Sequence, residues 1–462
     1  MPAAQAARKR TGAYYTPEEF AAMIAGRLVG PLGDAEWGCL PSERPIRVVD
    51  PACGDGRLLA AVAEALAAHG LAAELYGCDI DGNALDAIRV PDVTTIHADA
   101  LAHDWQGQRF DIVIGNPPFL SQMAATSTRG GASRHGGGPY ADAAAEFLAL
   151  ATRLADSAHG RIALILPQSI LGARDARPIR DEVDRLADLV WSWWSPDQRL
   201  FDAQVNVCVV ALRRPSTGAA TVWTRVVTDA LGIPPLDARE LDTDGTIGDR
   251  AMLNANFRDE YYALVPAVAD DADGPPLVTS GLIDPARCRW GERPVTFNKC
   301  KFDRPRVDVS RLEGRFRAWA ARKLVPKVLV ANQTRVVEAV ADVDGAWLPG
   351  VPVTTIVPVD PCRAIATCRE VEALLCSPVA SILCWQEGAG TGLSPRTVRV
   401  SPAVLGAIPW PAGDLGPAVV ALADGDVVAC ARAVLDAYAV AAGARDPMLR
   451  WWDAQRPAGT DS

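Results

Sequence analysis

The residues best suited to chemistry form a corner where residues 111–115, an apolar run, lead into Asn116, Pro117, Pro118 and Phe119. The first proline keeps Asn116 out of the helical region, and the missing N–H groups leave the carbonyls of Asn116 and Pro117 outside any strand ladder. An amine can donate one hydrogen to the Asn116 side-chain oxygen and one to the Pro117 carbonyl. Its lone pair would then point at an electrophile while Phe119 packs on the attached ring. The simpler alternative is that the two prolines only end a buried strand.

A glycine-rich turn that begins at Asp50 lies between a predicted strand and a predicted helix. Ala52, Gly54 and Gly56 leave room for a ligand near the backbone, which suits a nucleoside in a doubly wound sheet. Asp50 and Asp55 flank the glycines, and their carboxylates would repel a pyrophosphate. The turn therefore favours a cationic ligand such as S-adenosyl-L-methionine, which carries a sulfonium and an ammonium group but no phosphate.

Two further predicted strands end in acids, Asp79 and Asp99. A carboxylate at Asp79 can accept hydrogen bonds from both hydroxyls of a ribose. Ile80 would lie against an adenine ring, and Asp99 would accept from the amino group of that adenine. Because the carboxyl ends of parallel strands meet at one edge of a sheet, we expect these residues to lie near Asn116.

A helix is predicted from Pro17 to about Gly30, where apolar residues recur at helical spacing. Thr16 is the predicted N-cap, Pro17 the first helical residue, and Glu18 and Glu19 the acids of the first turn. The N–H groups and positive dipole at this helix start would seat a carboxylate. The alternative is an ordinary capped helix.

Five motifs occur along the chain in this order: TP at 16–17, DPACGDG at 50–56, GCDID at 77–81, HAD at 97–99 and NPPF at 116–119. The combination resembles N6-adenine DNA methyltransferases of the gamma, TaqI-like class. Three later segments continue the resemblance: YADAAAEF at 140–147, GRIALILPQS at 160–169 and LFDAQVNVCVV at 200–210. The resemblance covers residues 10–214.

The resemblance implies an α/β, Rossmann-like methyltransferase fold, with a mostly parallel seven-stranded sheet and helices on both faces. It implies that S-adenosyl-L-methionine is the cofactor, bound by residues around the strand ends: Thr16, Asp50, Ala52, Gly54, Gly56, Asp79, Ile80, Asp99 and Asn116. The adenine amine would be held by the corner: Asn116, Pro117, Pro118 and Phe119. Phe201 matches the aromatic residue that stacks on the flipped base in this family. The alternative for Phe201 is a core phenylalanine at a strand start.

The formal net charge of −10 argues against a protein that coats nucleic acid indiscriminately. The charge is uneven, because residues 286–335 hold fourteen Lys or Arg and four acids, a net charge of +10. A basic patch on an acidic body predicts contact with a polyanion on one face. The DNA-contact candidates are four residues of this segment and two of the Gly- and Ser-rich loop 121–139: Lys299, Lys301, Arg304, Arg306, Arg129 and Arg134.

The expected organisation is a catalytic domain over residues 1–215, a mixed α/β target-recognition domain over 216–412, and a C-terminal helical segment with a flexible tail over 413–462. The second region contains short β-type runs, at 327–331 and 351–357 among others. The last region contains a helical pair from about Leu415, and a short polar end follows Trp452.

The eleven cysteines have no paired spacing, which is typical of a reducing compartment, and no zinc or other metal site is expected. No stretch of 18 uncharged apolar residues occurs, so we expect a cytoplasmic protein without a membrane partner. The function expected is site-specific N6-adenine methylation of double-stranded DNA in a restriction-modification or phage-defence system.

Three alternatives stay open at this point. One is a methyltransferase that acts on RNA bases or on protein glutamine, since these enzymes use the same corner. A second is a subunit that is active only within a larger defence complex. The third concerns partners, because the sequence does not decide whether a cognate restriction endonuclease works beside this chain.

Overall fold

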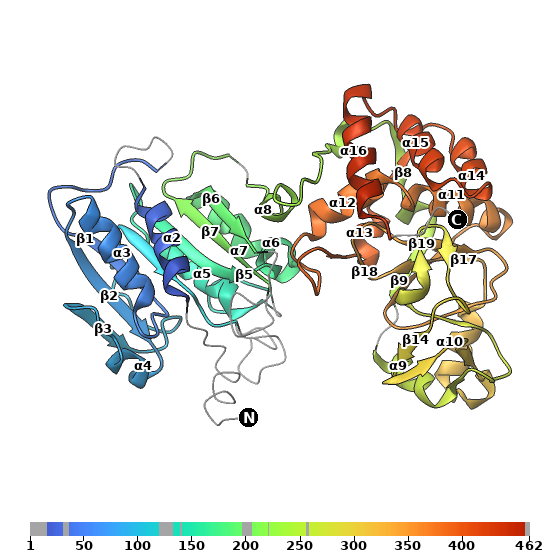
Figure 1. The fold of residues 1–462 in the computed structure, drawn as a ribbon, viewed down its shortest axis with the longest axis horizontal. Helices are drawn as coiled ribbons and strands as arrows, with labels where there is room; N and C mark the ends of the chain where they lie inside the picture. Colours follow the sequence, from blue (N-terminus) through green and yellow to red (C-terminus); the bar gives the residue numbers. More distant parts are fainter. Residues whose placement is uncertain are drawn as a thin grey trace. The chain divides into compact units, whose positions relative to one another are not determined.

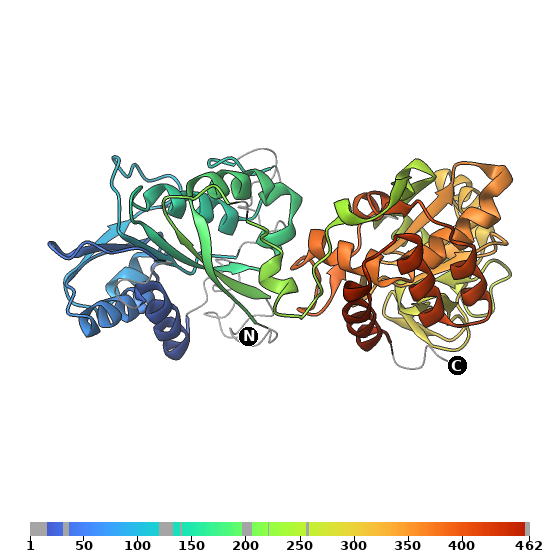
Figure 2. The ribbon, with the colours of Figure 1, turned by 90° about the horizontal axis from the view of Figure 1, so that it is seen from above.

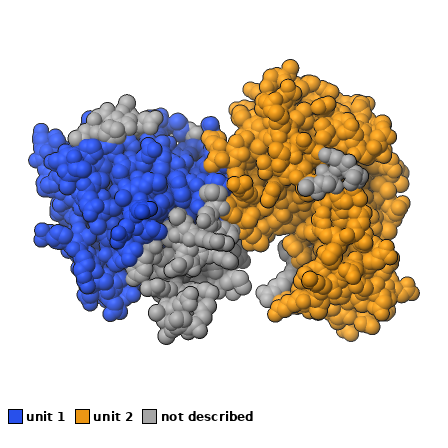
Figure 3. Space-filling model, viewed as in Figure 1, with its two compact units in different colours: residues 1–227 blue, residues 228–462 orange. Residues whose placement is uncertain are grey.

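The computed structural model describes residues 16–30, 37–119, 133–138, 141–195, 206–219, 221–255 and 258–457. The chain divides into two compact units, residues 1–227 and 228–462 (Figure 3). Among the described residues, no helix is both long enough and apolar enough to cross a membrane.

The first unit is built on a seven-stranded sheet with the order β3-β2-β1-β4-β5-β7-β6 (Figure 1). The strands are β1 (Ile46–Asp50), β2 (Ala73–Asp79), β3 (Val93–His97), β4 (Ile112–Gly115), β5 (Arg161–Pro167), β6 (Asp188–Trp194) and β7 (Val207–Arg213). β7 runs antiparallel to both of its neighbours, while the other pairs are parallel. This order confirms the predicted methyltransferase fold class.

Helices cover both faces of this sheet (Figure 2). One face carries α2 (Glu18–Val29) and α3 (Arg57–Ala68), and the other carries α5 (Ala143–Leu154) and α7 (Arg177–Leu186). The apolar side chains of α2 and α3 pack on those of β1 and β4 in one buried core, which fixes the helices against the strands. The shorter helices are α4 (Gly82–Asp86), α6 (Ser169–Gly172), η1 (Arg174–Ala176) and α8 (Arg225–Thr228).

The start of α2 differs from the prediction. The helix begins at Glu18, Pro17 is its N-cap, and no side chain caps it, so the predictions that Thr16 is the cap and Pro17 the first helical residue are wrong. The reason is tertiary, because the Thr16 hydroxyl accepts a hydrogen bond from the distant Asn116.

The second unit contains a four-stranded antiparallel sheet with the order β19-β17-β21-β9. Its strands are β9 (Ala251–Ala255), β17 (Lys327–Ala331), β19 (Ala339–Asp342) and β21 (Val353–Pro358). α11 (Ala364–Leu375) packs on one face. Leu329, Ala331 and Val353 point from the other face into a second core, which includes Val295 of a hairpin.

Short two-stranded ladders surround this sheet. They are β10 (Val268–Ala269) with β16 (Arg306–Val307), β11 (Leu277–Val278) with β20 (Leu348–Pro349), β12 (Ile283–Asp284) with β13 (Arg287–Cys288), β14 (Val295–Phe297) with β15 (Cys300–Phe302), β18 (Gln333–Thr334) with β22 (Val398–Arg399), and β8 (Thr243–Thr246) with β23 (Pro409–Pro411). The helices among them are η2 (Ala238–Glu240), η3 (Ile247–Asp249), α9 (Arg258–Leu264), η4 (Val265–Ala267), η5 (Ser280–Leu282), η6 (Val309–Arg311), α10 (Arg315–Lys323), η7 (Pro361–Arg363), α12 (Pro378–Gly388) and α13 (Pro402–Gly406).

Three helices follow within the same unit: α14 (Gly416–Ala423), α15 (Val427–Ala437) and α16 (Ala442–Gln455). The first two form the predicted helical pair and pack on α11, while α16 packs on α12 and α15. α16 is not predicted from the sequence, and Trp452 lies fully buried within it. The polar end predicted to be flexible after Trp452 is instead helical as far as Gln455, and its residues 458–462 lie outside the described residues.

Candidate active site

The carboxyl edge of the first sheet brings together most of the predicted site residues. Asp50 is the last residue of β1, Asp79 is the last residue of β2, and Asn116 directly follows β4. These three strands are adjacent and parallel, so their ends meet at one edge. The prediction that the next strand ends at Asp99 is wrong, because the β2–β3 ladder stops at the pair of Asp79 with His97 and Asp99 lies two residues beyond β3.

Asn116 is held by a residue one hundred positions away in the sequence. Its amide Nδ2 donates a hydrogen bond of 3.2 Å to Thr16 Oγ1, and Thr16 itself is buried. Since this bond uses the amide nitrogen, Oδ1 is the atom that the amide can offer to an incoming amine. Pro117 is buried, whereas Pro118 and Phe119 are half-buried, and Phe119 packs on the core beneath α2 and α3.

Asp50 is 1% exposed, and its Oδ1 accepts a 2.9 Å hydrogen bond from the Ala52 amide. Burial raises the pKa of Asp50 to about 8; that hydrogen bond opposes the rise, and the charge of Asp79 adds to it. Within the described part of the chain, no Lys, Arg or His pairs with this carboxyl. The site therefore holds a buried acid without a cation of its own.

Asp79 ties two turns together. Its Oδ2 accepts from the Gly54 amide at 2.8 Å, and its Oδ1 accepts from the Asp81 amide at 2.9 Å. Each oxygen has two lone pairs, so the carboxylate can accept further hydrogen bonds. Gly54 and Gly56 have φ values of +53° and +80°, which explains why glycine is required at both positions.

Ile80 follows Asp79 and is 71% exposed, which leaves a large apolar side chain bare beside the acids. Such a side chain is a suitable surface for an aromatic ring. Its backbone carbonyl lies 3.1 Å from His97 Nε2, so the segment between β2 and α4 is tied to the end of β3.

Asp99 is engaged by Arg134, one of the DNA-contact candidates. Asp99 Oδ2 lies 3.3 Å from Arg134 Nη1, and both side chains are partly exposed. Glu146 of α5, which is buried, accepts hydrogen bonds from the backbone amides of Arg134 and His135 at 3.0 and 2.7 Å. Glu146, which anchors this segment, is not among the residues predicted from the sequence, although a polar residue on the buried face of a predicted helix was a usable signal.

The remaining candidates are distributed over both units. In the second unit, Lys299 lies at the tip of the β14–β15 hairpin and Lys301 on β15, and both are exposed. Arg304 and Arg306 stack on the ring of Trp290, 5.6 and 4.9 Å from its centroid. The other two candidates, Arg129 and Phe201, lie outside the described residues.

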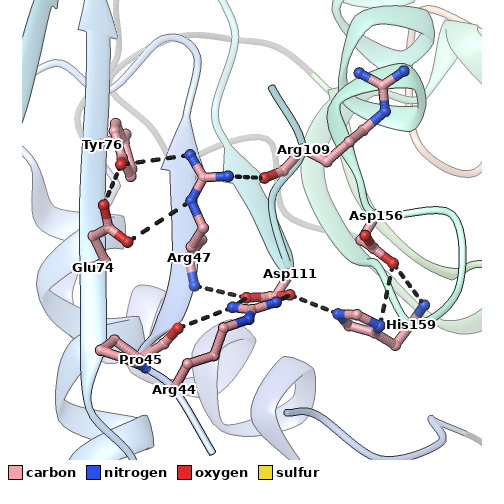
Figure 4. A network of polar contacts seen from close by, with 9 residues as sticks. All are labelled: Arg44, Pro45, Arg47, Glu74, Tyr76, Arg109, Asp111, Asp156 and His159. Carbon is pink, nitrogen blue, oxygen red and sulfur yellow. Dashed lines mark hydrogen bonds and ion pairs between the residues drawn. The ribbon is translucent and has the colours of Figure 1, made fainter. Parts of the chain in front are cut away.

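The opposite, amino edge of the same sheet carries a second acid, Asp111, in a different environment (Figure 4). Arg44 donates two hydrogen bonds to it, at 2.6 and 2.8 Å, and the Arg47 amide donates a third at 2.8 Å. His159 Nε2 lies 2.6 Å from Asp111 Oδ1. Burial alone would raise the pKa of Asp111, but these hydrogen bonds lower it below its usual value.

No cluster of three or more His, Cys, Asp or Glu side chains suited to a metal ion occurs among the residues that the structure describes. The polar groups at the carboxyl edge are carboxylates, backbone carbonyls and the Asn116 amide. At the carboxyl edge, an oriented amide oxygen and a proline corner lie beside three acids and an exposed isoleucine.

Comparison with known proteins identifies relatives of the first unit. Residues 2–223 match the family model described as N-6 DNA Methylase. The type II methyltransferase M.TthHB8I of Thermus thermophilus is 37% identical over 97 residues, which cover 20% of this chain and 21% of that protein. The type II methyltransferase M.CvrRI of Paramecium bursaria Chlorella virus XZ-6E is 23% identical over 226 residues, which cover 47% of this chain and 52% of that protein.

The match to solved structures extends over the whole chain. The type IIL restriction-modification enzyme MmeI, solved in complex with DNA, matches with a TM-score of 0.55 at 13% identity, covering 100% of this chain and 78% of that one. At this identity the match concerns the fold alone. The chain spans about half or less of the length of the two curated relatives.

Proposed function

We propose that the protein is a site-specific DNA N6-adenine methyltransferase, because residues 2–223 match the family model described as N-6 DNA Methylase. The methyl donor proposed is S-adenosyl-L-methionine, and the substrate is an adenine flipped out of double-stranded DNA. The observation that carries the proposal is the orientation of Asn116 by Thr16 at the carboxyl edge, beside Asp50 and Asp79.

The residues of this edge fit the proposed cofactor. Asp50 is a buried acid that lacks a cation in the described part of the chain, and the ammonium group of the cofactor would supply one. Asp79 keeps acceptor capacity for the ribose hydroxyls, and exposed Ile80 offers an apolar surface to the adenine ring. The Asp99 carboxylate would accept a hydrogen bond from the adenine amino group, either after the ion pair with Arg134 breaks or beside it.

When bound, the cofactor supplies an electrophilic methyl group. Asn116 Oδ1 and the Pro117 carbonyl would accept the two hydrogens of the target amine, which directs its lone pair away from them. Positioning matters here because the lone pair of the adenine amine is delocalised and weakly nucleophilic. Phe119, and Phe201 by the family resemblance, would stack on the extruded base and offset a flipping cost of a few kcal/mol by about 1–3 kcal/mol per contact.

The wider role is proposed from the relatives. Both curated relatives are named as type II methyltransferases. We assign this chain to a restriction-modification system in the cytoplasm, with the second unit as the DNA target-recognition region. Whether a cognate endonuclease or further subunits are needed for activity is decided by assay of the purified chain.

The test is expression of the full chain in a host without DNA methylation, followed by nucleoside analysis for N6-methyladenine. The wild type should produce N6-methyladenine in a defined sequence context. Asn116→Ala removes the amine acceptor, and we expect methylation to fall by at least about 10³-fold, as for loss of a transition-state hydrogen-bond partner.

The control in this experiment is cofactor binding, measured by equilibrium dialysis with tritiated S-adenosyl-L-methionine. Asn116→Ala should retain binding, because the acids of β1 and β2 are untouched. DNA methylation that persists in Asn116→Ala would refute the assignment of the corner. Absence of N6-methyladenine from the wild type, both in the host and with the purified chain on plasmid DNA, would refute the function.

A further inference from the structure

The β14–β15 hairpin of the second unit is a two-stranded ribbon with a tight turn. Phe297 pairs with Cys300, so Asn298 and Lys299 alone form the loop. Their φ values are +47° and +64°, and two consecutive positive values are what a type I′ turn requires. Asparagine suits such a position, since its short polar side chain tolerates the left-handed region.

One face of the ribbon fixes it to the protein. Val295 is buried in the core under the four-stranded sheet, and Phe297 is buried in a neighbouring core with Leu277 and Trp319. Thr296, between them, pairs with Lys301, so these two side chains share the opposite face, and both are exposed. The ribbon is thus held rigidly while a polar face is left to solvent.

The charges of this face differ from those of the surrounding basic segment. Most cations of residues 286–335 are already used inside the unit, in ion pairs, hydrogen bonds or stacking: Arg287, Arg289, Arg293, Arg304, Arg306, Arg311, Arg315, Arg317, Lys323 and Lys327. Lys299 and Lys301 make no hydrogen bond or ion pair with any residue that the structure describes. Among the described residues, four cations of the segment therefore remain without such a partner, and two of these, Lys299 and Lys301, lie on this ribbon.

A hollow with polar and apolar lining adjoins the exposed face. It has a volume of about 430 Å³; Thr279, Thr296 and Asn298 are among its polar lining residues, and Tyr261, Val351 and Pro352 are among its apolar ones. The Thr296 hydroxyl and the Asn298 amide can donate to phosphate oxygens or to base edges. The polar face of the ribbon therefore carries the donors and the positive charge.

We propose that the β14–β15 hairpin enters the major groove of DNA and reads the target sequence. The major groove admits a two-stranded β-ribbon, and its base edges match the side chains at hand. The Asn298 amide can pair with the N6 and N7 positions of an adenine, while Lys299 and Lys301 reach guanine acceptors or phosphates. The inference rests on the proposed function, because it names the element that selects the site to be methylated.

Cys300, which pairs with Phe297 next to the turn and is exposed, reports on contact at the tip of the ribbon. It is exposed and lies between Lys299 and Lys301, whereas exposed Cys362 lies in η7, which leads into α11 on the other face of the four-stranded sheet. The full chain is treated with N-ethylmaleimide with and without a saturating pool of random-sequence duplexes. Peptide mass spectrometry then gives the rate for each thiol.

We expect DNA to slow alkylation of Cys300 several-fold and to leave Cys362 unchanged. Equal rates at Cys300 with and without DNA would overturn the proposal, even if the protein methylates DNA. Protection of Cys300 in a protein that methylates no DNA would support the hairpin and refute the proposed function, so the two failures are distinguishable.

A charge variant measures the same contact without a thiol. Lys299→Ala/Lys301→Ala should weaken duplex binding and reduce the slope of log K against log salt by about 2. The control is Arg363→Ala/Arg369→Ala, which also removes two exposed cations, one in η7 that pairs with Glu370 and one in α11. Equal slopes in the two double variants would contradict the proposal.

Base reading is tested by selecting bound duplexes from the random pool. Asn298→Gly keeps the positive φ of the turn and removes only the amide. We expect discrimination to fall about 10- to 100-fold at one base position, with the rest of the selected motif unchanged. An unaltered motif would overturn the role of Asn298, and a wild type that selects no motif would overturn the reading role of the hairpin.

Discussion

Asp50, the last residue of β1, and Asp111, which directly precedes the adjacent strand β4, are both buried, and their pKa values shift in opposite directions. Asp111, at the amino edge, is neutralised by Arg44 and approached by His159 (Figure 4). Asp50, at the carboxyl edge, has one backbone donor and a second acid, Asp79, nearby. The difference separates two uses of a buried carboxylate, one that completes the fold and one that awaits a ligand.

Local sequence and burial alone do not distinguish a structural buried acid from a functional one. Asp50 ends an apolar strand and Asp111 directly precedes one, and both side chains are almost inaccessible to water. A buried acid without a cation is costly to the fold, so its presence at the edge where ligands bind in such sheets indicates function. A buried acid with cations and an amide donor around it indicates structure.

Asp111→Asn should have the largest effect on stability. The substitution leaves Arg44 without its counter-charge, and because Arg44 is 45% exposed we expect a loss of about 2–3 kcal/mol in the free energy of unfolding. The lowered pKa of Asp111 means that its stabilisation is present at neutral pH and is lost as the pH falls below about 4.

Urea denaturation at pH 7 measures this change, and hydrogen exchange of peptides from β4 and β5 reports the first unit separately from the second. Asn116→Ala, at the other edge, serves as the matched variant, because it should change activity and leave this stability nearly intact. If the Asp111→Asn protein were as stable as the wild type, the claim that Asp111 stabilises the fold would be wrong.

In the protein without cofactor, Asp50→Asn should increase the free energy of unfolding, whereas Asp111→Asn should decrease it. Between pH 4 and 8 the folded state keeps a proton on Asp50 that the unfolded state has lost, so the wild type loses stability as the pH rises through this window. At pH 8 we expect Asp50→Asn to be more stable than the wild type by about 1 kcal/mol. The same denaturation series at pH 5 and pH 8 checks the sign, and a destabilised variant at pH 8 would contradict the account.

The sequence predicted the carboxyl edge well because each part of it is local. The apolar runs that end at Asp50, Asp79 and Gly115 specify strands, and the glycines with positive φ specify the turn that follows β1. Turn chemistry and a two-residue period are properties of neighbouring residues, so they can be read without knowing the fold.

Other features depend on contacts between distant residues and could not be read in this way. The bond from Asn116 to Thr16 joins residues one hundred positions apart and turns an expected helix cap into a support for the site. Arg304 and Arg306 look like free cations in the sequence, but they stack on Trp290. α16 contains Pro447, which opposes a helix locally, while burial of Trp452 stabilises it.

Arg134→Ala should have the smallest effect of these variants. It tests whether Arg134 competes with the cofactor for the Asp99 carboxylate. Removing the partly exposed partner of Asp99 frees its carboxylate for the cofactor, so we expect the affinity for S-adenosyl-L-methionine to rise by no more than about fivefold. Arg177→Ala, which breaks an exposed ion pair with Asp181, is the control. A lower affinity in Arg134→Ala than in this control would show that Arg134 helps to bind the cofactor instead of competing with it.

The central claim is tested most directly by calorimetric titration of S-adenosyl-L-methionine into the wild type, Asp50→Asn and Asp111→Asn at one pH. We predict that the wild type and Asp111→Asn bind one cofactor with equal affinity. Asp50→Asn should bind at least about tenfold more weakly, because a charge-assisted contact is lost. Equal affinity in Asp50→Asn and Asp111→Asn would contradict the claim that the carboxyl edge is the cofactor site.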